Sequence, residues 1–271
     1  PALAEALLEN ISQIVAQSDV DGERFHMLGA RSVTVAGNLK ADTAPPPLPD
    51  REAALALAQA IARRPTFAAV STHAGEEAII ADVHRKVSER LPRLMTIIVP
   101  RHVERAPEIV KELAAKGLRV ARRSLGEMPD PTTDIYLGDT VGEMGLYLRL
   151  TEVAFVGRSL AGEGGQNPLE AAMLGTAVLS GRYVQNFRDI YQRLIKNGGA
   201  RIVKDGEQLA EEVELLLTDA EARAAMSAAG KASVHEMRGA LSRTMQALEP
   251  FLHPLRLTLN FERRQRGDPH R

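Results

Sequence analysis

Apolar and polar residues alternate with two different periods along this chain. Short apolar runs typical of buried strands are separated by longer segments in which apolar residues recur every three or four positions, as on one face of a helix. This alternation predicts crossover units and an α/β fold in which helices cover a parallel sheet. The expected strands are Ser32–Ala36, Phe67–Ser71, Met95–Val99, Leu118–Ala121, Asp134–Leu137, Val153–Val156, Ala177–Leu179 and Ala200–Val203. The expected helices are Arg51–Ala62, Glu76–Leu91, Val103–Lys116, Pro168–Leu174, Phe187–Lys196, Gly206–Leu217 and Ala220–Val234.

The two ends of the chain differ from this central pattern. The first residues repeat apolar side chains as a helix does, at Leu3, Leu7, Leu8, Ile11 and Ile14, and the chain starts at a proline, so we expect a partial sequence. A proline-rich connector over 44–49 marks a domain boundary. We therefore expect the end of a preceding domain over 1–43, a main domain over 44–238 and a helix over 239–252 that crosses back to the partner domain. The basic tail over 253–271 is expected to be disordered, or to contact anionic lipid headgroups.

A glycine-rich turn joins the expected strand at Val153–Val156 to a helix that starts with proline. The glycines within 162–165 can adopt positive φ and let a ligand approach the backbone. Asn167 suits the N-cap and Pro168 the first helical position, where free N–H groups and the helix dipole favour a phosphate or carboxylate. Glu170, one turn later, can accept hydrogen bonds from a ribose diol. The alternative is an ordinary tight turn.

Polar residues also follow three other expected strands. They form the segments Thr72–Glu77, Pro100–Arg105 and Gly138–Glu143. Because parallel strands end at one edge of the sheet, where ligands bind in such folds, these segments are expected to converge with the glycine-rich turn. Arg101 would offer that edge a bidentate donor for phosphate.

Some of these charged residues also have ordinary structural interpretations. Glu76 and Glu77 are typical of the first turn of a helix, where the dipole favours acidic side chains. Arg105 is expected to pair with Glu104 or Glu108 in solvent. Only the convergence of several strand ends therefore favours a ligand site over isolated surface features.

Composition excludes several classes of protein. The chain has 271 residues, of which 44% are hydrophobic and 25% charged, and a net charge of −1. That charge argues against a nucleic-acid partner, and the lack of cysteine removes disulfide and thiol chemistry. No apolar run of about 18 residues predicts a membrane span, so the chain itself is expected to be soluble. His73 and His102 have no third metal ligand in the sequence, and we expect neither a metal nor a cofactor.

Five motifs in the sequence resemble those of a known family. These motifs are Gly37-Asn38-Leu39-Lys40, Ser71-Thr72-His73-Ala74-Gly75-Glu76-Glu77, Pro100-Arg101-His102, Gly138-Asp139-Thr140 and Gly165-Gln166-Asn167-Pro168-Leu169-Glu170. In this order and spacing they resemble the 3-deoxy-D-manno-octulosonic acid (Kdo) transferases of Gram-negative bacteria, from about residue 8 to about residue 252. The resemblance implies a GT-B glycosyltransferase whose C-terminal half, a Rossmann-like parallel sheet with helices on both faces, binds CMP-Kdo. The enzyme would transfer Kdo to a lipid A precursor at the cytoplasmic face of the inner membrane, as a peripheral or anchored protein.

The resemblance also implies roles for particular residues. The positions that would contact CMP are Pro100, Arg101, Val141, Gly142, Glu143, Asn167, Pro168, Leu169 and Glu170. Lys40 falls where the family places a transition-state stabiliser. Together with Arg101 and the helix start at Asn167, it could stabilise the negative charge that develops on the departing phosphate.

The chain departs from the family pattern in two respects. It has Gly157-Arg158-Ser159 where the family commonly has Gly-Gly-Ser, and Gln166 where the family has histidine. The N-terminal half, which in the family carries the acceptor-lipid site and the general-base glutamate, has no counterpart here, so this chain alone is expected to be inactive. Two alternatives remain: a GT-B enzyme that uses another sugar nucleotide, and a non-catalytic nucleotide-binding module.

Overall fold

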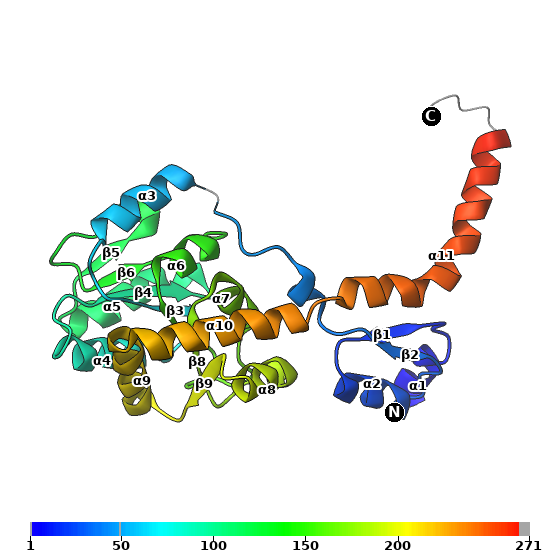
Figure 1. Cartoon of the computed structure of the whole chain (residues 1–271), viewed down its shortest axis with the longest axis horizontal. Coiled ribbons are helices and arrows are strands. Elements are labelled where there is room, and N and C mark those ends of the chain that lie inside the picture. Colours follow the sequence, from blue (N-terminus) through cyan, green and yellow to red (C-terminus); the bar gives the residue numbers. More distant parts are fainter. Residues whose placement is uncertain (1, 49, 266–271) are drawn as a thin grey trace. The chain divides into compact units, whose positions relative to one another are not determined.

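The computed structural model of the protein describes residues 2–48 and 50–265 (Figure 1). The chain forms two compact units. One contains the residues up to Thr43 together with those from His235 onward, and the other is Ala44–Val234. The boundary at Ala44 falls at the start of the proline-rich connector. The connector belongs to the larger unit, where the carbonyl of Pro46 accepts a hydrogen bond from Arg149 Nη1 at 2.8 Å.

The larger unit is built on a seven-stranded sheet with the order β5-β6-β4-β3-β7-β8-β9. Every neighbouring pair is parallel, which confirms the expected α/β fold. The strands are β3 (Thr66–Thr72), β4 (Met95–Pro100), β5 (Val120–Arg122), β6 (Ile135–Leu137), β7 (Val153–Val156), β8 (Ala177–Gly181) and β9 (Ala200–Val203). Seven of the eight expected strands thus belong to this sheet, with small differences at their ends.

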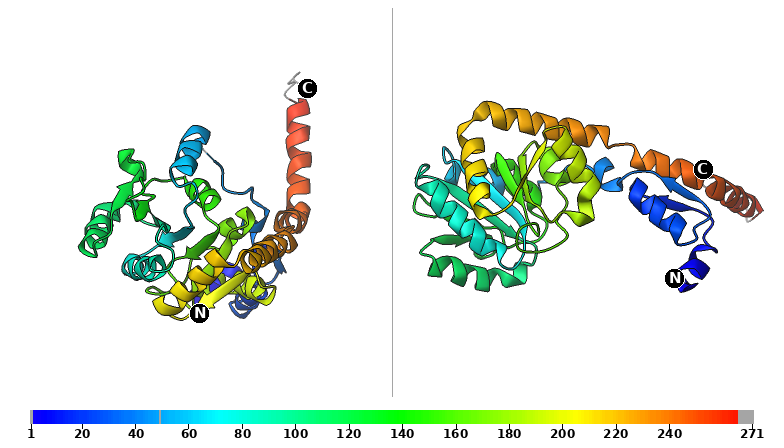
Figure 2. Two further views of the ribbon diagram at one scale, coloured as in Figure 1. Left: turned by 60° about the vertical axis from the view of Figure 1, so that its left-hand side comes forward. Right: turned by 90° about the horizontal axis from the view of Figure 1, so that it is seen from below.

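Helices lie around this sheet (Figure 2). They are α3 (Arg51–Ala60), α4 (Glu76–Ser88), α5 (Ala106–Ala115), α6 (Met144–Leu150), α7 (Leu169–Leu174), α8 (Arg188–Lys196), α9 (Gly206–Thr218) and α10 (Ala220–Glu236). The helix expected to start at Val103 begins instead with a 3-10 turn, η2 (Val103–Arg105), and α5 follows with Pro107 in its first turn. The short helix α6 was not expected from the sequence.

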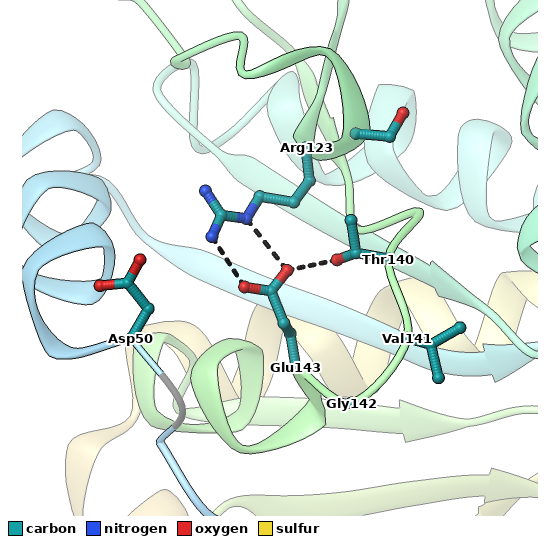
Figure 3. Close-up of a pocket in the computed structure, with 7 residues that line it drawn as sticks. Asp50, Arg123, Thr140, Val141, Gly142 and Glu143 are labelled. Carbon is teal, nitrogen blue, oxygen red and sulfur yellow. Dashed lines mark hydrogen bonds and ion pairs between the residues drawn. The ribbon is translucent and has the colours of Figure 1, made fainter.

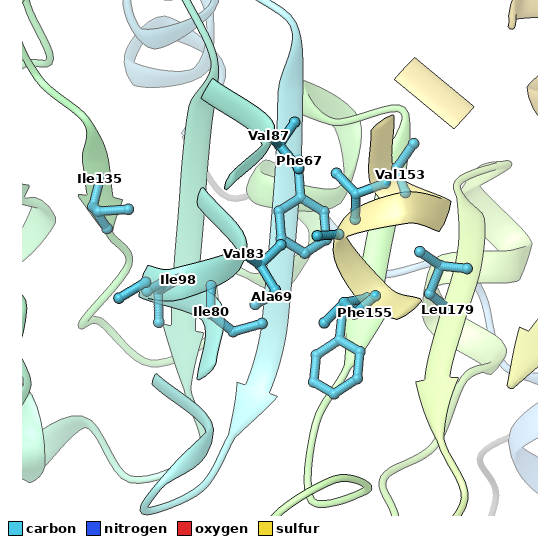
Figure 4. Close-up of a cluster of buried hydrophobic side chains, with 14 of the residues drawn as sticks. Phe67, Ala69, Ile80, Val83, Val87, Ile98, Ile135, Val153, Phe155 and Leu179 are labelled. Atoms are coloured by element: carbon cyan, nitrogen blue, oxygen red, sulfur yellow. The ribbon is translucent and has the colours of Figure 1, made fainter. Parts of the chain in front are cut away.

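The core occupies both faces of the sheet. Phe67 and Ala69 point to one face of β3, Ala68 and Val70 to the other, and all four are buried. Helices therefore cover both faces, as expected. Figure 4 shows part of the cluster on the face that α4 and α9 cover, with Phe67, Phe155 and their aliphatic neighbours in contact. Full burial of each such side chain stabilises the fold by about 1.5–3 kcal/mol.

The strand order places a topological switch point between β3 and β7. The chain leaves β3 toward β4 on one side and leaves β7 toward β8 on the other, so the two crossovers diverge. In open α/β sheets, ligands bind in the crevice that opens beyond the strand ends at such a point. A ligand site is therefore expected at the loops that follow Thr72 and Val156.

The smaller unit contains two parallel strands, short helices and the long helix α11. Its elements are α1 (Ala2–Leu8), β1 (Ile14–Ala16), α2 (Asp19–Met27), β2 (Val33–Val35), the 3-10 turn η1 (Leu39–Asp42) and α11 (Ala240–Gln265). The prediction that the first helical pattern extends to Ile14 is wrong. The helix stops at Leu8, and Ile14 pairs with Val33 as the first residue of a strand. A short apolar run does not distinguish a strand from a helix by its period alone.

Asp42 joins η1 to the start of α11 within the smaller unit. Its carboxylate accepts hydrogen bonds from the backbone N–H groups of Gly239 at 2.7 Å and Leu241 at 2.6 Å. The hydrogen bonds from Leu241 and Gly239 lower the pKa of Asp42. Arg243 Nε donates to the carbonyl of Ala36 at 2.7 Å. These contacts hold the segment that carries Lys40 against the first turn of α11.

Helix α11 is longer than the sequence predicts. It was expected over 239–252, with disorder over 253–271, whereas the helix continues to Gln265 through Pro250 and Pro254. Residues 266–271 of the expected basic tail lie outside the described residues.

A buried histidine makes the stability of the larger unit depend on pH. His84 on α4 is 3% exposed, and its Nδ1 lies 2.9 Å from Thr96 Oγ1. Desolvation by burial lowers its pKa from 6.5 to about 4, although Asp134 opposes the shift. The unfolded chain therefore binds a proton between pH 6.5 and 4 that the folded chain excludes. Acidification from pH 7 to pH 4 should lower the free energy of unfolding by about 3 kcal/mol through this group.

Urea titrations of the wild type and His84→Gln at pH 7, 6, 5 and 4 check this effect. The stability advantage of the wild type is expected to shrink as the pH falls, because only the wild type must protonate a buried imidazole. A difference in unfolding free energy that stays constant over this range would show that His84 does not carry the pH dependence.

Candidate functional site

A buried carboxylate ties together the two loops at the switch point. Glu76, the first residue of α4, is 0% exposed. Its Oε2 accepts from the backbone N–H groups of His73 at 3.0 Å and Arg158 at 2.6 Å. Its Oε1 accepts from Ser159 at 2.8 Å and Leu160 at 3.1 Å. A carboxylate with four such donors is well satisfied without a cation, and it joins the end of β3 to the turn after β7.

This arrangement uses part of the backbone of the glycine-rich turn within the fold. The N–H groups of residues 158–160 point at Glu76 rather than at an external anion. Further along, the N–H of Gly164 donates to Gln185 Oε1 and that of Gly165 to the carbonyl of Arg158. These backbone donors already have partners within the chain, so they form no open cradle for phosphate.

The helix start after the turn also differs from the expectation. Pro168, not Asn167, occupies the N-cap position of α7, and Asn167 Oδ1 accepts from the N–H of Leu169 at 3.1 Å. The helix has only six residues. Pro168 and Leu169 are buried, whereas Glu170 is exposed at the surface. Of the 167–170 segment, Glu170 is thus the side chain best presented to a ligand.

Buried Glu77 and half-buried Arg105 form an ion pair beside this loop. Glu77 is 0% exposed and accepts from Arg105 Nη1 at 2.9 Å, Arg105 Nη2 at 3.3 Å and Thr72 Oγ1 at 2.8 Å. The sequence predicted that Arg105 pairs with Glu104 or Glu108 in solvent, and this is wrong for its main partner, which is Glu77. A weaker contact with Glu108 is present, with 3.7 Å between Arg105 Nε and Glu108 Oε2. The hydrogen bonds that its guanidinium donates to Glu77 raise the pKa of Arg105.

Two arginines at this edge have no such partner. Arg101 follows β4 and Arg158 follows β7, and both are exposed. The N–H of Arg101 donates to the carbonyl of Thr72 at 3.0 Å, which fixes its backbone against the end of β3. Across residues 2–48 and 50–265, neither guanidinium forms an ion pair or hydrogen bond. Their charge is therefore available to an anionic ligand.

Two histidines accompany these arginines: His73 follows β3, which lies between β4 and β7, and His102 comes directly after Arg101. The rings of His73 and His102 meet edge to face, with centroids 5.5 Å apart. His73 Nδ1 lies 3.1 Å from the carbonyl of Ser71, which can only accept, so this nitrogen carries the proton and Nε2 is an acceptor. Burial lowers the pKa of His73, and the positive charge of Arg158 adds to that shift. His73 is thus neutral near pH 7.

A second group of polar residues lines an open cleft of about 530 Å³ at the ends of β5 and β6 (Figure 3). Glu143 accepts from Arg123 Nε at 3.0 Å and Nη2 at 2.7 Å, and also from Thr140 Oγ1. The hydrogen bonds from Arg123 lower the pKa of Glu143. The cleft is lined by Asp50, Arg123, Ser124, Thr140, Val141, Gly142 and Glu143. Its volume falls in the range of small-molecule sites.

The Gly-Asp-Thr motif gives this cleft its shape. A Cβ at Gly138 would lie 2.6 Å from the ring of Tyr147, so only glycine fits there. Asp139 is buried and accepts from the N–H of Ser124 at 2.8 Å and from Arg122 Nη2 at 2.8 Å. These bonds fix the 3-10 turn η3 (Arg123–Leu125) and with it the guanidinium that holds Glu143.

The sequence did not single out the residues that face the 140–143 loop across the cleft. Arg123 and Ser124 follow β5, and Asp50 is the N-cap of α3, where its Oδ1 accepts from the N–H of Ala53 at 2.9 Å. The other loops were selected because ligands bind beyond the carboxyl ends of parallel strands. Applied to the strand Val120–Arg122, the same reasoning would have identified Arg123 and Ser124.

Lys40 belongs to the smaller unit. It is exposed in η1, and its backbone N–H donates to Asn38 Oδ1 at 2.9 Å. In the part of the chain that the structure describes, no three histidine or acidic side chains gather as a metal site. The helices found there include none that combines the length and the apolar character needed to cross a membrane.

Comparison with known proteins relates both units to one family. Residues 1–43 match the family described as 3-Deoxy-D-manno-octulosonic-acid transferase (kdotransferase). The chain is 39% identical over 259 residues to 3-deoxy-D-manno-octulosonic acid transferase of Bordetella pertussis, and 33% identical over 256 residues to that of Haemophilus influenzae. The matches cover 93% and 92% of this chain but 59% of each relative.

A solved structure matches the larger part of the fold. The crystal structure of the C-terminal CMP-Kdo binding domain of WaaA from Acinetobacter baumannii superimposes with a TM-score of 0.64 at 31% identity. The match covers 68% of this chain and 96% of that domain.

Proposed function

Because this chain belongs to the 3-deoxy-D-manno-octulosonic acid transferase family, we propose that it is the donor-binding part of an enzyme that transfers Kdo from CMP-Kdo to a lipid A precursor. The reaction would serve lipopolysaccharide synthesis at the cytoplasmic face of the inner membrane. The chain spans 59% of the length of the Bordetella pertussis and Haemophilus influenzae relatives, and the acceptor site and the general base would lie in the remainder.

The observation that carries the proposal is the unpaired guanidinium of Arg101 at the ligand-binding edge of the sheet. We assign Arg101, with Pro100 holding the end of β4, to the phosphate of CMP. The loop Val141-Gly142-Glu143 would form one wall of the nucleoside site, since it lines the open cleft beside the next strand. Asn167, Pro168 and Leu169 would shape the ribose side, where the exposed carboxylate of Glu170 accepts from the diol.

The proposed reaction breaks the bond between the sugar carbon and the phosphate oxygen of CMP-Kdo. The electron pair of that bond stays with the phosphate, and CMP leaves. The acceptor hydroxyl oxygen bonds to the same carbon and gives its proton to the general base. Arg101 and Lys40 would stabilise the charge that grows on the phosphate, with Lys40 assigned from the family resemblance.

Arg101→Ala is expected to weaken CMP binding by about 1.5–3 kcal/mol, because a charge-assisted contact to phosphate is lost. Isothermal titration calorimetry of the full chain with CMP measures this change. Arg90→Ala is the matched control, because Arg90 follows the far end of α4 and pairs with Glu214 at 2.7 Å. Equal affinities of Arg101→Ala and wild type for CMP would remove Arg101 from the phosphate site.

A further inference from the structure

We infer that Arg158 binds the carboxylate of the donor sugar, and thereby selects a nucleotide-activated sugar acid over a neutral sugar. The inference rests on the proposed CMP-Kdo function but concerns a residue outside the CMP-contacting positions. Its basis is the placement of an unpaired guanidinium directly beyond β7, beside the switch point of the sheet.

The backbone of Arg158 is held in a conformation that suits glycine. Its φ is 56°, in the left-handed region, where a residue with a Cβ costs about 1–2 kcal/mol. The hydrogen bond from its N–H to Glu76 at 2.6 Å keeps it there. The chain thus carries a long cationic side chain where glycine would be the least strained choice. Such strain is commonly retained where it presents a functional group.

Among the described residues, no acidic side chain forms an ion pair with Arg158. Glu76 is the acidic group next to its backbone, but both carboxylate oxygens of Glu76 are occupied by backbone N–H groups. The Arg158 charge reaches the imidazole of His73, since it contributes to the lowered pKa of that residue. The guanidinium therefore adds positive potential to the same edge that carries Arg101.

The spacing of Arg101 and Arg158 suits a ligand with two neighbouring anionic groups. They follow β4 and β7, which flank β3, so their backbones start about 10 Å apart and their long side chains can converge. In CMP-activated Kdo the phosphate oxygen and the carboxylate are bonded to the same carbon. One arginine would take the phosphate and the other the carboxylate. His73, at the end of β3 between them, presents its Nε2 as an acceptor for a sugar hydroxyl.

The test compares the binding of CMP and of freshly prepared CMP-Kdo to the full chain by calorimetry. In Arg158→Gly, CMP affinity is expected to stay within about twofold of wild type, while CMP-Kdo affinity falls about tenfold or more as a charge-assisted contact is lost. Glycine suits a φ of 56°, so this variant should fold at least as well as the wild type. Arg158→Lys should retain part of the preference for CMP-Kdo.

Arg182→Ala is the control for general positive potential, since Arg182 is an exposed arginine directly after β8. It should leave both affinities unchanged. An unchanged preference for CMP-Kdo in Arg158→Gly would overturn the inference, and so would an equal loss in Arg182→Ala. Failure of the wild type to bind CMP at all would instead contradict the proposed function.

Discussion

Glu76→Ala is expected to lower the free energy of unfolding by about 4 kcal/mol or more. The substitution leaves four backbone N–H groups, those of His73 and residues 158–160, without their acceptor in a buried position. Each unsatisfied buried donor costs about 1–3 kcal/mol, partly offset by local rearrangement or entering water. Because the two loops at the switch point lose their common anchor, binding of CMP-Kdo should be lost together with stability.

Urea denaturation followed by circular dichroism measures the effect of Glu76→Ala. Glu76→Gln should cost less, about 2–3 kcal/mol, since the amide keeps one acceptor oxygen but turns an N–H₂ group toward the remaining donors. Glu170→Gln is the matched control, because Glu170 occupies the first turn of α7 but is exposed. It should change the stability by less than about 0.5 kcal/mol. Wild-type stability of Glu76→Ala would mean that the four N–H groups find other partners.

Lys40→Ala is expected to lower kcat by about 10²–10³-fold in an active enzyme, as removal of one stabilising donor does elsewhere. An enzyme for this test can be made by joining residues 1–271 to the N-terminal part of the Bordetella pertussis relative, which the chain does not cover. Lys40 is assigned to the departing phosphate, whose charge develops in the transition state. The loss should therefore fall mainly on kcat, with little change in KM.

Kdo transfer from CMP-Kdo to a tetraacyl lipid A precursor provides the measurement. Residues 1–271 alone should show no transfer, and Lys204→Ala in the fusion should behave as wild type, because Lys204 is an exposed lysine after β9. Asn38→Ala should cause a smaller loss than Lys40→Ala, since Asn38 acts on Lys40 through its backbone N–H and otherwise donates to Gln17. An undiminished kcat in the Lys40→Ala fusion would show that the lysine takes no part in the reaction. Kdo transfer by residues 1–271 alone would show that the general base lies within this chain.

The sheet could be predicted from the sequence because its strands are buried on both faces. Apolar runs such as Val153–Val156 carry that signal wherever both neighbours are strands. The hydrophobic pattern is weaker in short elements. Ile14 was assigned to a helix because its strand has three residues, and α6 was not expected because its seven residues include a glycine. Short elements contain too few periods for their pattern to be recognised.

Strand ends were the part of the site that the sequence could locate. Parallel strands must end at one edge, so the loops around His73, Arg101 and Glu143 were expected to be neighbours before their geometry was known. The glycine-rich turn had already drawn attention to Asn167, Pro168 and Glu170, and the family motifs added Lys40 and Leu169. None of this specified which side chains would face a ligand and which would be used within the fold.

Long-range contacts decide which polar side chains are bound within the fold and which remain available to a ligand. Glu76 looks like any acidic residue at a helix start, yet it reaches 82 to 84 residues along the chain to the N–H groups of the glycine-rich turn. Arg105 turns inward to Glu77, whereas Arg101 and Arg158 keep their charge exposed. Local sequence sets the period, the caps and the charge of each segment. Which polar groups satisfy one another depends on distances that exist only once the strands are aligned, and so the available charges at the site follow from the tertiary structure.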